Sequence, residues 1–509
     1  MSMRCVHFMF LLVLPLFFQL VQGSAKQPNV IFLFSDDQRY DSLTMTGDPV
    51  NETPHLDKLA DEGVFFSKCF MTSPICGPSR ANIFTGQWER KNRIGFHSYS
   101  KNVVTKDAFE NSFLYKLKQA GYSTAFIGKH HTQIVDGRNQ LLKDNVDFCY
   151  YGVGHLSFHP AKGHKVFANL KNKSQTEALF EATEAFLSEG EEFDYFYENM
   201  DKSSGFDPQR RDSSKPFCAW INLNLPHQSS LGGMGSDESD PEFYSKRYQD
   251  RLDQLPFPKG YPLDCNLPKD VMNPDELPGY YRLNKERLIS TKLQTARAIY
   301  GIDLFVKNLR QLLKNIGEDE NTIIIFSSDN GLMYGEQGMS GKSMLYEDSV
   351  HVPLIVYSPF LKKKDQGLQI DELVVGQDIP ATILDMCGLS IPDTYQGASM
   401  LPLIKGENVE WRKDVFLENL FTDQSYPRHE AVRGQRYKYI RYFKKDEDRK
   451  KYLPYASIEG EEAIYEELFD LEADPEERNN LAANPEYIEV LKVHRLRCKD
   501  MVKELADRN

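Results

Sequence analysis

The chain has 509 residues, of which 40% are hydrophobic and 27% charged, and this balance excludes wholesale disorder and fibrous repeats. A chain of this length holds several folded units or one large α/β unit with additions. Acidic residues outnumber basic residues by 74 to 61, which gives a net charge of -13. A non-specific nucleic-acid binder normally carries the opposite sign, so we expect no nucleic-acid partner. If the substrate is an anion, the positive charge that attracts it has to be local.

The N-terminus has the pattern of a secretory signal peptide over residues 1–23. Arg4 precedes an apolar stretch at residues 8–18, and small residues follow from Gly23 to Ala25. A membrane anchor is the alternative, but the apolar run is short for a span and Pro15 interrupts it. We therefore expect an exported protein without stable membrane insertion. It would be periplasmic or secreted in a bacterium, and lysosomal or extracellular in a eukaryote.

From residue 24 to residue 410, predicted strands and helices alternate along the chain. The continuous apolar run at residues 29–34 is typical of a strand buried on both faces of a sheet. A short helix follows at residues 53–63, with Pro54 in its first turn and Gly63 at its end. The later elements are a strand at 64–66, a helix at 113–121, strands at 123–128 and 217–223, a helix at 287–316 and a strand at 321–327. This alternation predicts an α/β fold in which helices sandwich a large, mostly parallel sheet.

Two internal segments fit this alternation poorly. Residues 158–216 and 229–285 are polar and rich in Gly, Ser, Asp and Pro, so we interpret them as long insertions on the edge or rim of the sheet. The C-terminal part has a different character again. It holds three short runs typical of antiparallel strands and a terminal helix, at residues 430–433, 437–441, 467–471 and 484–506. We therefore predict a catalytic domain over residues 24–410 and a smaller C-terminal α+β subdomain with an antiparallel sheet over residues 411–509.

Seven cysteines remain once Cys5 leaves with the signal peptide. Their number is odd and they are scattered over a long chain, so this is not a small domain held together by disulfides. Export permits disulfides, but the spacing does not pair these cysteines, and one of them is left for another role. Two glycosylation sequons, at Asn51 and Asn172, would matter only in a eukaryotic host.

Two predicted strands end in acidic or amide side chains. Asp36 and Asp37 follow the first strand, and Asp329 and Asn330 follow the strand at residues 321–327. Ligands gather at the carboxyl ends of parallel strands, so these four side chains are expected at one edge of the sheet. Oxygen ligands of this kind suit Ca²⁺, with Mg²⁺ as the alternative. Taken singly, each pair could also be an ordinary set of turn residues.

The stretch Cys76-Gly77-Pro78-Ser79-Arg80 predicts a helix that begins near Cys76, because proline fits the first turn of a helix. Backbone N–H groups at such a position favour an anion, and Arg80 can bind a tetrahedral anion with two hydrogen bonds. A buried structural cysteine is a second interpretation, and a thiolate nucleophile activated by the helix N-terminus is a third. The local chemistry alone does not choose among the three.

The motifs together resemble the signature of the type I, formylglycine-dependent sulfatases of the alkaline-phosphatase superfamily. The most specific part is Cys-x-Pro-Ser-Arg at residues 76–80, which is followed by Thr85-Gly86. The other matches are Asp36-Asp37, Gly128-Lys129-His130-His131, Pro226-His227, Ser328-Asp329-Asn330-Gly331, Gly341-Lys342, residues 346–354 and residues 469–481. The last of these stretches is similar to bacterial polysaccharide sulfatases. The resemblance covers most of the chain and implies an alkaline-phosphatase-like fold.

The resemblance also implies a role for each matched residue. Cys76 would be converted to 3-oxoalanine (Cα-formylglycine), so a formylglycine-generating or sulfatase-maturating enzyme is an expected partner. The metal ligands implied for Ca²⁺, or for Mg²⁺, are Asp36, Asp37, residue 76, Asp329 and Asn330. The catalytic residues implied are Cys76, Arg80, Lys129, His131, His227 and Lys342, where the Lys-x-His spacing selects His131 over His130.

In the mechanism that the resemblance implies, one hydroxyl of the hydrated formylglycine attacks sulfur and expels the alcohol. The metal, Arg80, Lys129 and Lys342 neutralise the sulfonyl oxygens. His227 and Lys342 protonate the leaving oxygen. His131 takes the proton of the second hydroxyl, after which the aldehyde forms again and sulfate leaves.

The predicted function is therefore the hydrolysis of sulfate esters on a sulfated carbohydrate, such as an algal polysaccharide or a glycosaminoglycan. The alternative is a phosphonate or phosphate ester hydrolase on the same scaffold. A two-zinc phosphatase would need several His and Asp ligands for a second metal, and the sequence has no candidate set for them. A relative that only binds glycans is expected to have lost Cys76 or a metal ligand, and all of these residues are present.

Overall fold

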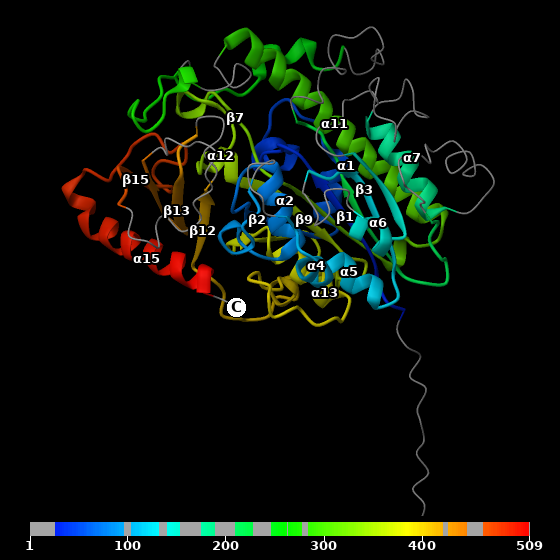
Figure 1. The fold of residues 1–509 in the computed structure, drawn as a ribbon. Helices are drawn as coiled ribbons and strands as arrows, with labels where there is room; N and C mark the ends of the chain where they lie inside the picture. The colour runs from blue at the N-terminus through cyan, green and yellow to red at the C-terminus, as the bar shows by residue number, and fades with distance from the viewer. Residues whose placement is uncertain are drawn as a thin grey trace, which may run out of the picture.

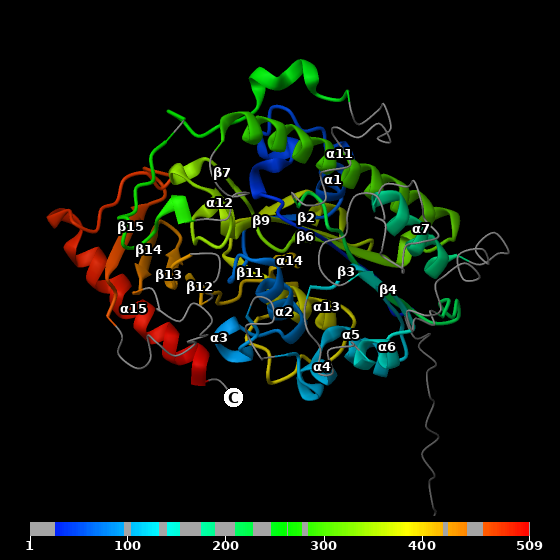
Figure 2. The ribbon, with the colours of Figure 1, turned by 45° about the horizontal axis from the view of Figure 1, so that its top comes forward.

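The structure is a computed structural model that describes residues 26–95, 103–131, 140–152, 175–188, 209–227, 246–261, 263–276, 284–420, 426–444 and 462–507. The predicted signal peptide and the sequon at Asn172 lie outside these residues. Figures 1 and 2 show a large sheet with helices on both faces and a smaller sheet beside it that carries the C-terminal helix. The predicted fold class, α/β with a C-terminal antiparallel sheet, is confirmed.

A nine-stranded sheet forms the centre of the molecule. Its strands lie in the order β10-β2-β9-β6-β1-β5-β3-β4, and β11 also pairs with β2. The bounds are β1 Asn29–Ser35, β2 Val64–Phe70, β3 Ser123–Lys129, β4 Phe148–Gly152, β5 Phe217–Asn222, β6 Thr322–Ser328, β9 His351–Tyr357, β10 Leu368–Ile370 and β11 Val374–Val375. Strand β1 lies between β5 and β6, parallel to both, and every residue of it is buried. Burial on both faces explains its continuous apolar sequence.

The sheet is mostly parallel, as predicted, but β9 runs antiparallel to both of its neighbours, β2 and β6. No strand was predicted there. Pro353 lies within β9, and a proline argues against a central strand because it has no N–H to donate to the ladder. Opposite Pro353, the register of β2 shifts between Phe66 and Cys69. Proline is tolerated at such an irregularity. The proline therefore argued against a strand in the sequence, although the folded protein has one there.

Two groups of helices cover the two faces of the sheet (Figure 2). One group contains α1 Pro54–Asp61, α7 Gln175–Leu187 and α11 Lys285–Asn315. The other contains α2 Cys76–Thr85, α4 Lys106–Asn111, α5 Phe113–Gln119 and α13 Asp378–Met386. Shorter helices are α3 Glu89–Asn92, α6 Gln140–Asn145, α12 Glu347–Val350 and α14 Leu401–Ile404. The predicted helices at 53–63, 113–121 and 287–316 correspond to α1, α5 and α11.

Helix α7 corrects the interpretation of residues 158–216 as an insertion on the rim. It packs against α11 and β3, and its side chains Leu179, Ala182 and Phe186 are fully buried. Their spacing of three and four residues is the spacing of one helix face. Part of this segment is therefore a helix that covers the central sheet.

The C-terminal part forms a four-stranded antiparallel sheet in the order β12-β13-β14-β15. Its strands are β12 Asp414–Asn419, β13 His429–Gly434, β14 Tyr437–Tyr442 and β15 Tyr465–Asp470, and α15 Ile488–Asp507 packs on β13 and β14. Phe416 and Ile440 of this sheet share an apolar cluster with Phe70 and Met339 of the larger part. This second apolar cluster therefore joins the two sheets, and it places the C-terminal strands beside the loops that follow β6.

Three expectations concern the surface and the thiols. In the part of the chain that the structure describes, no helix is long and apolar enough to cross a membrane. The seven cysteines after the predicted signal peptide all lie in described segments, and all are free thiols. Asn51 of the first sequon is buried and donates a hydrogen bond from Nδ2 to the carbonyl oxygen of Ser42 at 2.7 Å, which leaves no room for a glycan.

Candidate active site

The structure brings the predicted metal ligands together at one edge of the sheet, as the ends of parallel strands require. Asp36 and Asp37 follow β1, and Asp329 and Asn330 follow β6, the strand next to it. The backbone N–H of Asp37 donates to Oδ1 of Asp329 at 3.2 Å, and Nδ2 of Asn330 donates to Oδ1 of Asp37 at 2.5 Å. All four side chains are buried. Asp37 has a φ of 67°, a left-handed conformation that turns the chain sharply at the site.

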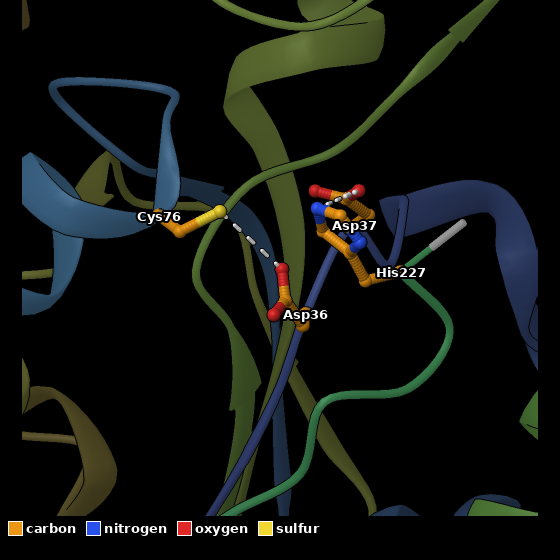
Figure 3. Close-up of side chains that lie close together, drawn as sticks. All are labelled: Asp36, Asp37, Cys76 and His227. Atoms are coloured by element: carbon orange, nitrogen blue, oxygen red, sulfur yellow. Dashed lines mark hydrogen bonds and ion pairs between the residues drawn. The ribbon is translucent and has the colours of Figure 1, made fainter. Parts of the chain in front are cut away.

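Cys76 is the first residue of α2, and its side chain points toward Asp36 (Figure 3). Its Sγ lies 3.6 Å from Oδ1 of Asp36 and accepts a hydrogen bond from Nζ of Lys342 at 2.9 Å. Burial raises the pKa of the Cys76 thiol to about 12, and the negative charge of Asp36 acts in the same direction. These surroundings disfavour a thiolate, so the unmodified side chain would be a poor nucleophile.

Arg80 lies one turn along α2 and is buried beneath the carboxylates. Its Nε donates to Oδ2 of Asp329 at 2.9 Å, and one terminal nitrogen donates to Oδ1 of Asn222 at 2.8 Å. The guanidinium also lies over the ring of Phe34, 5.1 Å from its centre. Arg80 is thus held in one orientation by partners from β1, β5 and the end of β6, and it fixes the start of α2 against the sheet.

Asn222, the last residue of β5, belongs to the site although the sequence analysis did not assign it a role. Its only signal in the sequence is a polar side chain at the end of a buried apolar run. The backbone of the neighbouring strand β3 approaches Asn222 closely. Gly128 of β3 has a φ of 99°, and a Cβ there would lie 1.9 Å from the carbonyl oxygen of Asn222. Only glycine fits, and this close approach positions Lys129, the next residue.

Two lysines complete the charge of the cluster. Nζ of Lys129, at the end of β3, forms an ion pair with Oδ2 of Asp36. Nζ of Lys342, which follows β8 Ser340–Gly341, forms an ion pair with Oδ1 of Asp37 at 2.6 Å. Both lysines are buried. They come from distant parts of the chain, so the cluster forms only in the folded protein.

The two histidines predicted to be catalytic, His131 and His227, and the adjacent His130 lie in different surroundings. His227 takes part in the cluster, with Nε2 3.7 Å from Oδ2 of Asp37 (Figure 3). His131 follows β3 at the same edge of the sheet, is half-buried and has a left-handed φ of 47°. His130 is fully buried against the ring of Phe126, and burial together with Arg80 lowers its pKa to about 3. His130 therefore stays neutral, which suits a packing residue.

The pKa values of the buried carboxylates shift in opposite directions. Burial would raise the pKa of Asp36, but the positive charges of Lys129, His227 and Lys342 hold it well below its usual value. Burial raises the pKa of Asp329 to about 7, and the nearby charge of Asp36 adds to this effect. The repulsion among these carboxylates is offset by the three cations paired with them, Arg80, Lys129 and Lys342.

Two observations show that a metal ion fits this cluster. Oδ1 of Asn330 is buried and has no hydrogen-bond partner among the described residues, although an amide oxygen normally accepts one. Asp36, Asp37, Cys76 and His227 offer ligand atoms that all lie within 4.8 Å of one another. The carboxylate and amide oxygens suit Ca²⁺ or Mg²⁺, whereas the sulfur and the imidazole nitrogen would suit zinc. Conversion of Cys76 to an oxygen-bearing residue would remove the sulfur and favour the first choice.

Comparison with known proteins identifies the family. Residues 28–389 match the family model described as Sulfatase, and residues 335–504 match the model described as N-sulphoglucosamine sulphohydrolase, C-terminal. The chain is 30% identical to an arylsulfatase of Clostridium perfringens, and the match covers 95% of each protein. It is 26% identical to an N-acetylglucosamine-6-O-sulfatase of Bacteroides thetaiotaomicron, over 91% of this chain and 84% of the relative.

Solved structures share the fold. A protein in complex with its substrate D-glucosamine-2-N,6-O-disulfate has a TM-score of 0.68 at 22% identity, and the match covers 95% of this chain and 99% of that protein. A phosphonate monoester hydrolase from Silicibacter pomeroyi has a TM-score of 0.66 at 20% identity, over 95% and 96% of the two chains. At such identities the likeness shows the fold alone, so the sequence matches decide the family. The chain belongs to the sulfatase family and is a hydrolase of sulfate esters, as its motifs predicted.

Proposed function

We propose that the chain removes sulfate from a sulfated carbohydrate, with residue 76 as the nucleophile after its conversion to formylglycine. The observation that supports this most strongly is the gathering of Arg80, Lys129 and Lys342 on the carboxylates beside residue 76. A sulfate ester is an anion that repels nucleophiles, so its hydrolysis needs positive charge at the reacting centre. The carbohydrate class is supported by relatives named N-acetylglucosamine-6-O-sulfatase and ulvan-active sulfatase.

A divalent cation completes the proposed site, with Ca²⁺ as the proposed ion and Mg²⁺ as the alternative. Asp36, Asp37, Asp329 and Asn330 would hold it together with residue 76. When bound, the ion withdraws electrons from the sulfonyl group and stabilises the charge that develops there. The three carboxylates are already balanced by Arg80 and the two lysines, so a bound dication would leave the site with net positive charge. Such a site attracts an anionic ester from solution.

Asp36 is proposed as the base for residue 76. Its pKa is held well below the usual value despite burial, so it is ionised at neutral pH. It lies 3.6 Å from the side chain of residue 76, within reach of a hydroxyl there after small adjustment. Arg80 and Lys342 would hold the sulfonyl oxygens, because both lie next to the same carboxylates and carry N–H donors.

His227 and His131 are proposed to act at different stages. His227 lies on the Asp37 side of residue 76 and is less completely buried than the carboxylates, so it would give its proton to the leaving oxygen with the help of Lys342. His131 lies at the end of β3 beyond Lys129, and would take up a proton from residue 76 when sulfate leaves. The positions favour separate roles, because the two histidines come from different loops.

The metal can be checked without measuring turnover. Elemental analysis of the purified protein should find about one Ca²⁺ or Mg²⁺ per chain, and a chelator should lower the melting temperature. Asn330→Ala should lose the ion, because it removes the oxygen that has no partner in the cluster. Asp303→Asn should keep the ion, because Asp303 is a buried carboxylate of α11 that lies outside the cluster and accepts hydrogen bonds from the first turn of α1. Two tightly held zinc ions per chain would contradict the proposed ion and support the phosphatase alternative.

A desulfation screen tests the proposed activity. The matured enzyme is incubated with defined sulfated oligosaccharides from glycosaminoglycans, ulvan and carrageenan, and released sulfate is measured. We expect sulfate release from at least one of them, and much slower release of phosphate or phosphonate from matched esters. Faster hydrolysis of the phosphorus esters than of every sulfate ester would favour the alternative function instead.

Export is the last part of the proposal, and it rests on the pattern of residues 1–23. Cleavage near Gly23 or Ala25 would deliver the mature chain to the periplasm or the exterior of a bacterium, or to the secretory route of a eukaryote. A formylglycine-generating or sulfatase-maturating enzyme would have to act on Cys76 in the same cell. N-terminal sequencing of the mature protein checks the cleavage, and an intact N-terminus at Met1 in the active protein would contradict it.

A further inference from the structure

The short helix α12, Glu347–Val350, lies between the central sheet and the C-terminal strands (Figures 1 and 2). On the side of the metal cluster, the carbonyl oxygen of Ser349 accepts a hydrogen bond from the backbone N–H of Gly331 at 2.8 Å. A Cβ on Gly331 would lie 2.1 Å from the carbonyl oxygen of Asp348, so the two backbones are in close contact and only glycine fits. The helix therefore fixes the residue that directly follows Asn330.

The backbone of Gly331 in turn sets the orientation of the Asn330 amide. Nδ2 of Asn330 donates to the carbonyl oxygen of Gly331 at 2.8 Å and to Oδ1 of Asp37 at 2.5 Å. These two bonds use both N–H groups of the amide, and Oδ1 is left without a partner among the described residues. A shift of Gly331 would therefore move this oxygen relative to the other proposed metal ligands.

The opposite end of α12 is held by Glu477, which lies between β15 and α15 in the C-terminal part. Its Oε2 accepts a hydrogen bond at 2.6 Å from the backbone N–H of Glu347, the first N–H of the helix. This N–H has no partner within the helix, so the carboxylate satisfies it. Glu477 is buried and has a left-handed φ of 53°, an uncommon conformation that persists where the surrounding contacts enforce it.

Glu477 is itself fixed by two further contacts. Its Oε1 forms an ion pair at 2.8 Å with Nζ of Lys438, which is fully buried on β14. Its carbonyl oxygen accepts a hydrogen bond from Nε2 of Gln337 at 2.7 Å. Lys438 also pairs with the side chain of Glu347 at 3.1 Å, so one ammonium group joins Glu477 to the residue that it caps. Loss of one partner from such a buried ion pair leaves the other charge uncompensated, so these groups hold one arrangement.

We propose that Glu477 is a positioning residue for the metal site, and that it acts through α12 and Gly331 on the metal ligand Asn330. The inference rests on the proposed function, because it requires the divalent cation proposed above. Only one helical turn separates the N–H that Glu477 caps from the carbonyl oxygen that binds Gly331, so no long flexible segment absorbs a displacement of the cap. Residues that support a metal ligand from behind typically contribute about 10–100-fold to metal affinity.

Metal affinity tests the proposal without a measurement of turnover. The bound ion is removed from the purified full-length protein with a chelator, and the Kd for added Ca²⁺ is measured by isothermal titration calorimetry. We expect Glu477→Ala to raise this Kd at least about tenfold, because the cap of α12 is lost. Glu477→Gln keeps an oxygen that accepts from the N–H of Glu347, so its Kd should stay within about threefold of the parent value.

The matched control is Glu430→Ala. Glu430 is also a buried carboxylate of the C-terminal sheet, but its ion pairs are with Arg441 at 2.6 Å and Arg90 at 2.5 Å. This variant should lower the melting temperature and leave the Kd for Ca²⁺ unchanged. If Glu477→Ala does not fold, Glu477→Asp takes its place. It keeps the charge but draws the carboxylate back from the N–H of Glu347, and it should also raise the Kd.

The possible failures can be told apart. An unchanged Kd in a folded Glu477→Ala or Glu477→Asp protein would overturn the positioning role, while the metal and the proposed function stand. An equal rise of the Kd in Glu430→Ala would also overturn it, because the effect would then follow from any loss of stability in the C-terminal sheet. If the parent protein binds neither Ca²⁺ nor Mg²⁺, the proposed metal site fails and the positioning role fails with it.

Discussion

Cys76→Ala should reduce sulfate release by roughly a thousandfold or more, because it removes the atom from which the nucleophile is made. The fold should persist, since alanine is a good helix former and fits a position where the larger thiol is already buried. The measurement is released sulfate at saturating substrate, with circular dichroism and the melting temperature as the check on folding. Peptide mass spectrometry of the parent enzyme should show the aldehyde in place of the thiol at residue 76.

Cys149→Ala is the matched control for this prediction. Cys149 is also fully buried, and it lies on β4, where its Sγ donates to the carbonyl oxygen of Leu142 at 3.6 Å. Loss of this thiol should lower stability slightly and leave turnover close to that of the parent, because Cys149 pairs with Phe126 of β3, three residues before Lys129, and its Sγ contacts the backbone of Leu142 and not the cluster. A fully active enzyme that carries only an unmodified thiol at residue 76 would refute the proposed nucleophile.

The features that could be predicted from the sequence are those fixed by local patterns. β1 and β6 are buried on both faces, so their apolar runs are unambiguous and the polar residues that end them, Asp36 and Asp329, are easy to place. α2 begins at Cys76 because the proline two residues later suits a first turn. The rule that strand ends of a parallel sheet share an edge then brings these side chains together without any knowledge of the tertiary structure.

The features that could not be predicted depend on contacts between distant segments. β9 contains a proline and is a strand only because β2 is irregular opposite it. Asn222 acquires a role from Arg80, which approaches it from a helix far away in the sequence. The ion pairs of Lys129 and Lys342 join residues that lie 93 and 305 positions from their partners. No periodicity encodes such pairs, and for these residues the resemblance to a family carried the prediction.

The C-terminal sheet also makes contacts with distant segments that could not be predicted from the sequence. Lys438 of β14 is fully buried between Glu347 and Glu477, with ion pairs of 3.1 and 2.8 Å. Glu347 starts α12 in the larger part of the molecule, and Gln337 of that part donates to the backbone oxygen of Glu477. The C-terminal strands are therefore tied to the larger part of the molecule by buried charges and hydrogen bonds. The sequence indicated the strands but not these contacts.

The last prediction separates the two histidines by the leaving group of the substrate. His227→Ala should lose about 10²–10⁴-fold in kcat on a sulfated sugar, because general acid catalysis is worth that much when the leaving alcohol is a poor one. On 4-nitrophenyl sulfate the same variant should lose far less, since nitrophenolate departs without a proton. His131→Ala should instead release a burst of alcohol that is not matched by free sulfate and then stall on either substrate, because its proposed step follows the departure of the alcohol. Stopped-flow detection of nitrophenol and ion chromatography of sulfate measure the two products independently. Equal losses for both variants on both substrates, with alcohol and sulfate always released together, would show that the separate roles are wrong.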